Sequence, residues 1–464
     1  MFDTKVYAQR RAKLKKLVGS GFILFLGNEE SPMNYTDNQF PYRQDSTFLY
    51  YFGIDAPGFS GAIDVDENKE YIFANDFTIS DIIWMGPQST VKQRAKEVGV
   101  KNTASDSDLS LMIKKILAQG RRVHYLPQYR AFNILKIEQL LGIHPKRMKE
   151  YSSLKLIKAI SEQRSIKAKE ELKEIEKAIS VAYDMQTTVM KLVRPGKNER
   201  ELAGIMEGIA VAAGGRLSFP TILSRNGQTL HNHYQGNVLK SGDLLVNDSG
   251  AETSMHYASD ITRTIPVNGK FSTIQKEIYQ VVLEMQLSSI KMIKPGKKYR
   301  QVHLGAAKVL VKRFKEMGLM KGDTEEAVRN GAHALFFPHG LGHMMGLDVH
   351  DMENLGEANT GYDEMTKRSD QFGLAYLRYG KEMEPGVVLT VEPGIYFIPE
   401  LIDLWKKEKK FTQFINYKDV LKHKNFHGIR IEDDVVVTKT GCTVLGKSIP
   451  KTIKEVEELA SMRD

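Results

Sequence analysis

Hydrophobic and polar residues follow two different spacings in the N-terminal part of the chain, which predicts both strands and helices. The apolar run FILFL at 22–26, bracketed by glycines, predicts a buried strand. Further strands are expected at 71–74 and 122–126, and helices at 7–17, 90–97, 109–117 and 129–141. The stretch 41–54 predicts a polar turn followed by an aromatic strand. Strands that alternate with helices indicate an α/β domain.

The second part of the chain opens with a different pattern. A long charged helix is expected from 165 to about 192, and two short strands are expected at 244–246 and 261–265. The stretches 354–381 and 399–428 are polar and aperiodic, which predicts long loops. We therefore expect two domains, an N-terminal one of residues 1–163 and a C-terminal one of residues 164–464.

The C-terminal part contains an internal repeat. GDLLVNDSG at 242–250 aligns without gaps on GVVLTVEPG at 386–394, so that Asp248 falls on Glu392. Asp260 opens the strand that follows the first copy, and Glu432 has the same place after the second. Helical text repeats as well, since 181–201 and 281–301 share Met-Gln and a PGK turn. Such a repeat predicts two similar halves, in which the four carboxylates converge near a pseudo-twofold axis.

Composition narrows the class of protein. The 464 residues are 41% hydrophobic and 27% charged, which is ordinary for a soluble globular protein. The 66 basic and 57 acidic residues give a net charge of +9, but no basic tract carries interleaved aromatic residues, so we expect no nucleic-acid partner. A single cysteine, Cys442, fits a reducing compartment. Without an apolar signal core or a run of membrane-spanning length, we expect a cytoplasmic protein with no membrane partner.

Histidines gather in two short segments. His339 and His343 flank Gly-Leu-Gly, His350 follows seven positions later, and His231 and His233 share the loop TLHNHYQGN. The glycines between the first two disfavour the helix that the HExxH zinc motif requires. A lone histidine is more often a hydrogen-bonded loop residue than a ligand, but five of the twelve histidines in two segments favour a site.

An arginine accompanies the carboxylates. Arg430 and Glu432 are two positions apart on an alternating strand, so their side chains face the same side. A neighbouring arginine keeps carboxylates ionised.

The motifs SDITRT, HGLGH, LDVHD, VEPG and RIEDD together resemble those of the proline-specific metallopeptidases with the pita-bread fold, in particular the Xaa-Pro aminopeptidases (aminopeptidase P). YRQDSTFLYYFG and the turn around Trp84 are similar to the N-terminal domain of that family. The resemblance covers nearly the whole chain. It implies an α/β (α+β) protein, with a smaller N-terminal domain followed by a pita-bread catalytic domain.

The resemblance also implies which residues form the site. The five metal ligands would be Asp248, Asp260, His343, Glu392 and Glu432, and Asp260 and Glu432 would bridge two ions. His231 matches a loop histidine of the family, with His233 as the alternative, and His339 and His350 match histidines that contact the substrate. Asp248 and Asp260 are twelve positions apart, one more than expected for the family, which predicts a bulged turn near 254–256.

The ligand types predict the chemistry. Four carboxylates and two divalent ions are close to neutral, and a water shared by two ions has a strongly lowered pKa. Ligation by oxygen with one imidazole favours Mn²⁺, while Co²⁺, Fe²⁺ and Zn²⁺ are also compatible. We expect hydrolysis of the peptide bond between an N-terminal residue and a following proline. Glu392 would accept the proton of the water and pass it to the departing proline nitrogen.

Two alternatives remain open at this stage. Xaa-Pro dipeptidase (prolidase) shares the metal residues and differs by clamping the C-terminal carboxylate of its substrate, but no arginine can be assigned to that role from the sequence. A non-catalytic peptide-binding module of the same fold is disfavoured, because all five ligand positions are filled. Serine or cysteine hydrolase chemistry finds no support, since Ser249 lies in no nucleophile elbow and Cys442 is remote from any histidine.

The resemblance further implies a homodimer or homotetramer that associates through the N-terminal domain. Trp84 would then contribute to the pocket of a neighbouring subunit.

Overall fold

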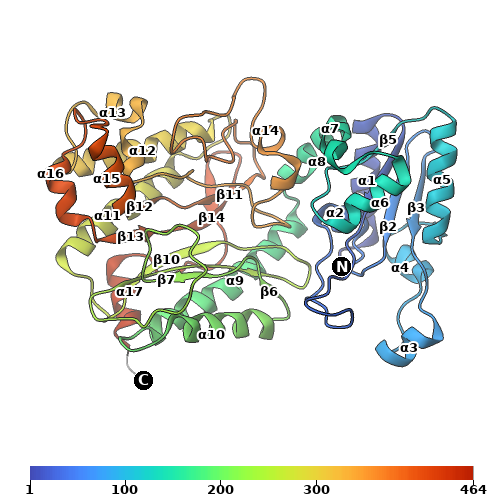
Figure 1. Ribbon diagram of the computed structural model, residues 1–464, viewed down its shortest axis with the longest axis horizontal. Helices are drawn as coiled ribbons and strands as arrows, with labels where there is room; N and C mark the ends of the chain where they lie inside the picture. Colours follow the sequence, from blue (N-terminus) through green and yellow to red (C-terminus); the bar gives the residue numbers. More distant parts are fainter. Residues whose placement is uncertain (463–464) are drawn as a thin grey trace. The chain divides into compact units, whose positions relative to one another are not determined.

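The computed structural model describes residues 1–462 of the chain, which form two compact units (Figure 1). The first unit comprises Met1–Arg164 together with Met352–Asn359, and the second begins at Ser165 and resumes at Thr360. The division after Arg164 lies one residue from the boundary expected from the sequence. The assignment of Met352–Asn359 to the first unit is a difference, because that segment falls in a stretch expected to belong wholly to the second domain.

The first unit is built on a mixed five-stranded sheet of order β4-β3-β2-β1-β5. β2 pairs antiparallel with β1 and β3, whereas the edge strands β5 and β4 pair parallel with β1 and β3, respectively. The strands are β1 (Phe22–Leu26), β2 (Ser60–Asp64), β3 (Lys69–Phe73), β4 (Asn102–Ala104) and β5 (Val123–His124). The helices are α1 (Thr4–Val18), α2 (Ser46–Phe52), α3 (Ile79–Met85), α4 (Val91–Glu97), α5 (Asp106–Ala118), α6 (Ala131–Leu141), α7 (Met148–Tyr151) and α8 (Leu154–Ser165), with a short 3-10 turn, η1 (Pro145–Arg147).

The aromatic segment expected as a strand within 41–54 is helix α2, so that prediction is wrong. Asp45 caps the helix by accepting hydrogen bonds from the backbone N–H groups of Thr47 and Phe48, and Gly53 ends it with φ 61°. Every residue of α2 is buried. A helix that is buried all round shows no polar periodicity, and its aromatic run therefore looks like a buried strand in the sequence.

The second unit consists of two similar halves. Each half has a pair of helices beside a short antiparallel sheet: α9 (Lys169–Leu192) and α10 (Glu199–Ala212) in the first, α11 (Thr273–Met292) and α12 (Tyr299–Glu316) in the second. The sheets have the orders β10-β8-β7 and β11-β14-β15. α9 packs on β8 and β10, and α11 packs on β11. The repeat read in the sequence is thus a repeat of structure.

The remaining elements of the second unit are short. Its strands are β6 (Arg216–Leu217), β7 (Ile222–Ser224), β8 (Leu244–Ser249), β9 (Ala251–Glu252), β10 (Ile261–Pro266), β11 (Val388–Val391), β12 (Gly394–Phe397), β13 (His427–Arg430), β14 (Asp433–Val437) and β15 (Cys442–Val444). Its other helices are α13 (Thr324–Asn330), α15 (Pro399–Lys407), α16 (Tyr417–Val420) and α17 (Ile453–Ala460), with 3-10 turns η2 (Ala332–Leu335) and η4 (Leu421–His423). The short elements η3 (Glu353–Leu355) and α14 (Glu357–Thr360) lie within the stretch 354–381 or at its start.

Two expectations for this unit need correction. The helix expected from 165 begins only at Lys169, because Ser165 ends α8 and the backbone N–H of Lys167 donates to the carbonyl of Gly386 in the short non-helical segment between the two helices. The stretch 399–428, expected as a loop, contains α15, whose Ile402 and Trp405 are buried on one face. The charged residues that follow obscure this short apolar face in the sequence. Among residues 1–462, no helix is long and apolar enough to cross a membrane.

Hydrogen bonds between the two hairpins hold the halves together. Glu432 donates its backbone N–H to the carbonyl of Thr262 at 3.0 Å. Asp260 donates its backbone N–H to Oδ2 of Asp434 at 3.1 Å, and Asp434 is fully buried. The acidic ends of the two hairpins are thereby brought into one place.

Candidate active site

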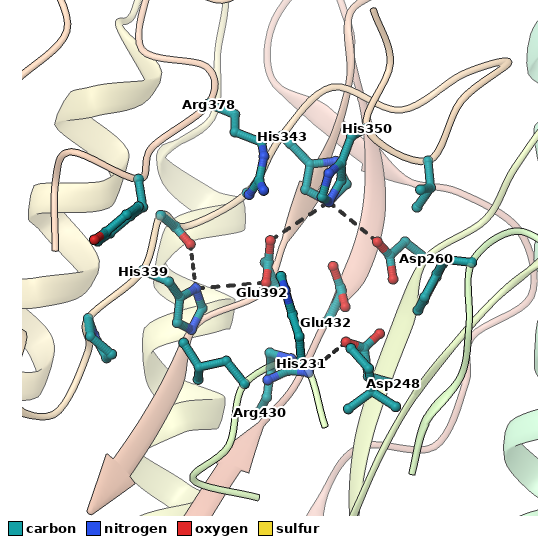
Figure 2. A pocket seen from close by; sticks show the side chains of 18 of the residues that line it. His231, Asp248, Asp260, His339, His343, His350, Arg378, Glu392, Arg430 and Glu432 are labelled. Carbon is teal, nitrogen blue, oxygen red and sulfur yellow. Dashed lines mark hydrogen bonds and ion pairs between the residues drawn. The ribbon is translucent and has the colours of Figure 1, made fainter. Parts of the chain in front are cut away.

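A cavity of about 590 Å³ lies in the second unit where the two hairpins meet. Figure 2 shows carboxylates, imidazoles and two arginines that converge on it. All nine residues that the sequence assigned to the site line this cavity: His231, Asp248, Asp260, His339, His343, His350, Glu392, Arg430 and Glu432. His233, the alternative to His231, lines it too.

Strand geometry aims the carboxylates into the cavity. Asp248 lies in β8 opposite Thr262 of β10. Glu392 directly follows β11 and Glu432 directly precedes β14, and the last pair of these strands is Val391 with Asp433. Because side chains alternate along a strand, neighbours of the carboxylates point the other way, toward the helices.

The extra residue between Asp248 and Asp260 is absorbed in a turn, as expected. Thr253 donates its backbone N–H to the carbonyl of Tyr257, and His256 adopts a left-handed conformation with φ 65°. β10 still pairs with β8 in continuous register. Both aspartates therefore keep their places at the cavity.

Arg430 is a buried cation that ties the two halves together. Its Nη2 donates to Oδ2 of Asp248 at 2.6 Å, its Nη1 donates to the Tyr396 hydroxyl at 2.9 Å, and its Nε donates to the Thr262 hydroxyl at 3.2 Å. Burial lowers the pKa of Arg430, but Tyr396, Asp248 and Glu392 raise it well above its ordinary value. Arg430 therefore stays charged and opposes the negative charge of the cavity.

His343 is held in one tautomer. Its Nδ1 lies 3.0 Å from the carbonyl of Met344 and must donate to it, so Nε2 keeps its lone pair. Nε2 lies 3.3 Å from Oδ2 of Asp260 and 3.8 Å from Oε1 of Glu392. Burial lowers the pKa of His343 well below its ordinary value, which keeps the ring neutral. This is the orientation in which a histidine binds a metal ion.

The acidic cluster fits divalent cations. Ligand atoms of Asp260, His343 and Glu432 lie within 4.8 Å of one another. Oδ1 of Asp248, Oδ1 of Asp260 and Oε1 of Glu432 are buried and have no hydrogen-bond partner among the described residues. Burial and mutual repulsion raise the pKa of Asp260 and of Glu432 well above their ordinary values. Buried, unpaired carboxylate oxygens are costly, and divalent ions bound there would satisfy them.

His339 belongs to a hydrogen-bonded chain that starts at Arg430. The Tyr396 hydroxyl accepts from Arg430 and lies 2.9 Å from Nε2 of His339, while Nδ1 of His339 lies 2.8 Å from the carbonyl of Gly340. Nδ1 must donate to that carbonyl, so Nε2 accepts from Tyr396. Burial lowers the pKa of His339 to about 3, so the ring is neutral.

The other two histidines lie on either side of the carboxylates. The ring of His350 packs edge to face on His343, with centroids 4.2 Å apart. His231 comes from the loop after β7, and burial together with the charge of Arg430 lowers its pKa.

Several residues of the site were not found from the sequence. Arg378 lines the cavity (Figure 2), but it comes from the aperiodic stretch 354–381, where no pattern marked it. Tyr396 on β12 was also missed. Gln186 is fully buried and donates to the Ser249 hydroxyl and the Ile261 carbonyl at 3.1 and 2.8 Å, which joins the strand ends that carry the two aspartates. The repeated Met-Gln was the available signal, since Gln286 likewise donates to Asp433.

Comparison with known proteins gives a match over both units. Residues 173–439 match the model of metallopeptidase family M24, and residues 7–125 match that of the aminopeptidase P N-terminal domain. The chain is 31% identical over 467 residues to a human Xaa-Pro dipeptidase, covering 96% of this chain and 90% of the relative. It is 32% identical over 468 residues to a probable Xaa-Pro aminopeptidase of Sordaria macrospora, and the match covers 99% of this chain and 96% of the relative.

Solved structures agree with this match. Aminopeptidase P from E. coli, determined with the inhibitor Pro-Leu, superposes with a TM-score of 0.81 at 28% identity and covers 99% of this chain and 98% of its own. Proline aminopeptidase P II from Yersinia pestis superposes with a TM-score of 0.80 at 27% identity, and the match covers 99% of this chain and 100% of that structure. The predicted α/β fold, with a smaller N-terminal domain before a pita-bread domain, is confirmed. The chain belongs to metallopeptidase family M24 and carries the aminopeptidase P N-terminal domain.

Proposed function

We propose that this chain is an Xaa-Pro aminopeptidase, a metal-dependent exopeptidase that hydrolyses the bond between an N-terminal residue and a following proline. The observation that carries the proposal is the convergence of five ligand-type side chains, with unpartnered carboxylate oxygens, in one cavity. Two divalent ions would be held by Asp248, Asp260, His343, Glu392 and Glu432. Relatives named for Xaa-Pro cleavage match over nearly the whole chain.

The direct test is the requirement for proline. We expect the metal-loaded protein to cleave Ala-Pro-Ala to Ala and Pro-Ala and to leave Ala-Ala-Ala intact, as followed by chromatography of the products. Equal cleavage of both tripeptides would contradict the proposal.

The residues that line the cavity have different roles in the proposed reaction. Divalent ions held there supply Lewis acidity, which brings the pKa of a water molecule close to neutrality and polarises a carbonyl. Glu392 accepts a proton from the attacking water and delivers it to the proline nitrogen. That nitrogen is tertiary in the substrate, so it must be protonated as the C–N bond breaks. Arg430 holds Asp248 in place throughout.

The histidines would bind and orient the substrate. His231 and His350 line the cavity beside the carboxylates and are assigned to contact with the peptide. His339 has both ring nitrogens engaged in the free protein, so it contacts the substrate through a nitrogen only after it releases Gly340 or Tyr396. We assign to His339 the stabilisation of negative charge on the carbonyl oxygen, by donation from Nδ1 once Gly340 is released.

Mn²⁺ is the proposed metal, because the donor set is rich in carboxylate oxygen and holds one imidazole. A cytoplasmic location is proposed from the single cysteine, which requires no oxidising compartment.

Xaa-Pro dipeptidase is the second candidate, and Arg378 favours it. The guanidinium lines the cavity and is near enough to Glu392 and His339 to lower the pKa of both. A planar cation inside a peptide-binding cavity is suited to clamp a free carboxylate with two hydrogen bonds. This is the feature that the sequence alone did not reveal.

Replacing Arg378 with methionine distinguishes the two candidates. If Arg378 clamps the carboxylate of a dipeptide, the R378M variant has a KM for Ala-Pro raised by roughly 10–100-fold, since hydrogen bonds to charged groups contribute about 1.5–3 kcal/mol. The KM for Ala-Pro-Ala would change little. If the chain is an aminopeptidase, we expect both the native protein and the R378M variant to cleave Ala-Pro-Ala better than Ala-Pro. Arg368→Met, in the same loop but outside the cavity lining, is the control.

Removal of the metal makes stability depend on pH. Burial raises the pKa of Glu392 to about 7 from 4.5, against the pull of Arg430 and with the repulsion of Asp248. A carboxyl group whose pKa is raised in the folded state stabilises it at low pH and loses this effect as pH rises through the folded pKa. We expect the metal-free Glu392→Gln variant, which cannot ionise at this position, to gain stability relative to the metal-free native protein as pH rises from 4.5 to 7, by roughly 3 kcal/mol from this one carboxyl group. The two proteins are compared because the buried histidines His333, His339 and His343, whose pKa values are lowered, change the stability of both in the opposite direction. Calorimetry after chelation tests this, and a difference between the two proteins that stays constant over the interval would contradict it.

Association through the first unit is proposed from the exposed apolar face of α3. Ile79, Ile83 and Trp84 on this helix are 74%, 73% and 84% exposed, and none of its residues is buried. An apolar helix left in water marks an interaction surface, here for a second copy of the chain as a homodimer or homotetramer.

Charged substitutions on α3 test this association. We expect the double variant Ile83→Glu/Trp84→Glu to elute as a monomer in size-exclusion chromatography with light scattering, because buried carboxylates oppose the interface. Leu111→Glu, at another exposed apolar position on α5, should leave the assembly intact. A monomeric native protein would contradict the proposal.

A further inference from the structure

The position of His231 depends on its loop. The loop runs from the end of β7 to the start of β8, and the His231 imidazole has no hydrogen-bond partner among residues 1–462. Its ring nevertheless reaches the cavity beside Arg430 and Asp248 (Figure 2). The backbone of the loop must therefore fix where the ring lies.

One buried carboxylate holds this loop at two points, one on each side of His231. Glu199, the first residue of α10, is fully buried and does not line the cavity. Its Oε1 accepts from the backbone N–H of Arg225 at 2.8 Å, and its Oε2 accepts from the backbone N–H and the Nδ2 of Asn237 at 3.1 and 2.9 Å. His231 lies midway between these two residues in the sequence. The two oxygens of one side chain thus close a loop with His231 at its centre.

Main-chain bonds fix Glu199 itself. Its N–H donates to the carbonyl of Asn237 at 3.0 Å, and the next N–H of the helix, that of Arg200, donates to Gln235 at 3.0 Å. At the start of α10 the carboxylate is also favoured by the helix dipole. Glu199 is therefore a rigid clamp that belongs to the helix.

Two direct hydrogen bonds also cross His231. Asn232 donates to the Ser224 hydroxyl at 2.9 Å, and Gln235 donates to the Thr221 carbonyl at 3.0 Å. Both join the loop to β7 or to the segment before it. Glu199 differs because it belongs to α10 and fixes the backbone on both sides of His231 to that helix.

We propose that Glu199 is a positioning residue for His231 and sets how far the centre of the loop reaches into the cavity. The inference rests on the proposed peptidase function. A carboxylate is required because all three groups that face it are N–H donors. In Glu199→Gln the side-chain NH₂ would face one of these donors, so the loop would be released on one side of His231.

A double-mutant cycle tests the proposal. The kcat and KM for Ala-Pro-Ala are measured for the native protein, Glu199→Gln, His231→Ala and the double variant, with metal content and Tm recorded for each. We expect Glu199→Gln to lower kcat/KM by up to roughly 10²-fold, the size of effect that follows from displacing a catalytic group by 1 Å. The relative contributions of kcat and KM to this loss should be the same for Glu199→Gln as for His231→Ala. The double variant should be no worse than His231→Ala alone.

Two further variants keep the test decisive. Glu457→Gln removes another buried carboxylate that accepts a backbone N–H, that of Phe271 at 3.0 Å, and should leave kcat/KM unchanged. If Glu199→Gln does not fold, Asn237→Ala removes one donor of the clamp and should show a smaller loss that is again absent without His231.

The outcomes separate the two proposals. Failure of the native protein to cleave Ala-Pro-Ala would overturn the proposed function. Cleavage by the native protein, with effects of Glu199 and His231 that multiply independently, would overturn the role of Glu199 alone.

Discussion

Replacing Glu392 with glutamine is expected to lower kcat for Ala-Pro-Ala by roughly 10²–10⁴-fold, the usual contribution of a general acid–base. Glu392 directly follows β11 and has its two carboxylate oxygens 3.8 Å from His343 Nε2 and His339 Nδ1. Glutamine keeps the size of the side chain and an oxygen that can face a metal, but it cannot carry a proton from water to the proline nitrogen.

The measurement is steady-state turnover at a metal content verified by elemental analysis. Glu384→Gln, an exposed position before β11, is the control and should have native activity. Unaltered turnover of Glu392→Gln with two ions bound would end the proton-transfer role.

Replacing Asp260 with asparagine is expected to have two opposite effects. The carboxylate lies 3.3 Å from His343 Nε2, and ligand atoms of Asp260, His343 and Glu432 lie within 4.8 Å of one another. Its loss should weaken metal binding by more than the roughly 10–100-fold that follows removal of an outer partner, and activity should fall with it. Without metal, however, the variant should be more stable than the native protein at neutral pH, because burial and Glu432 raise the pKa of Asp260 and make its charge unfavourable.

Titration calorimetry with Mn²⁺ and thermal unfolding of the metal-free proteins measure the two effects. Asp184→Asn, on the exposed face of α9, should change neither. A metal-free Asp260→Asn protein that unfolds at a lower temperature than the native metal-free protein would show that Asp260 supports the fold instead of straining it.

Local rules explain why so much of the site could be predicted from the sequence. Antiparallel pairing and the alternation of side chains depend on neighbouring residues alone, so the duplicated GDLLVNDSG and GVVLTVEPG passages already indicated two hairpins with acidic ends. The structure brings those ends together, and Asp248, Asp260, Glu392 and Glu432 all line one cavity. Their roles as ligands stay a prediction that the proposed experiments test.

Features that depend on the tertiary structure could not be predicted from the sequence. Helix α2 is buried on every side, so its aromatic residues carried no helical period. Arg378 reaches the cavity from an aperiodic loop, where position follows from packing and not from spacing. The clamp of Glu199 joins residues 26 and 38 positions away, which no local pattern could link.

The most direct test of the central claim is to strip the protein of metal, reload it with Mn²⁺ and supply Ala-Pro-Ala and Ala-Pro side by side. An Xaa-Pro aminopeptidase releases Ala and Pro-Ala from the tripeptide, in the reloaded protein and not in the stripped one. Cleavage of Ala-Pro alone would contradict the aminopeptidase assignment and identify a dipeptidase, with Arg378 as the carboxylate clamp.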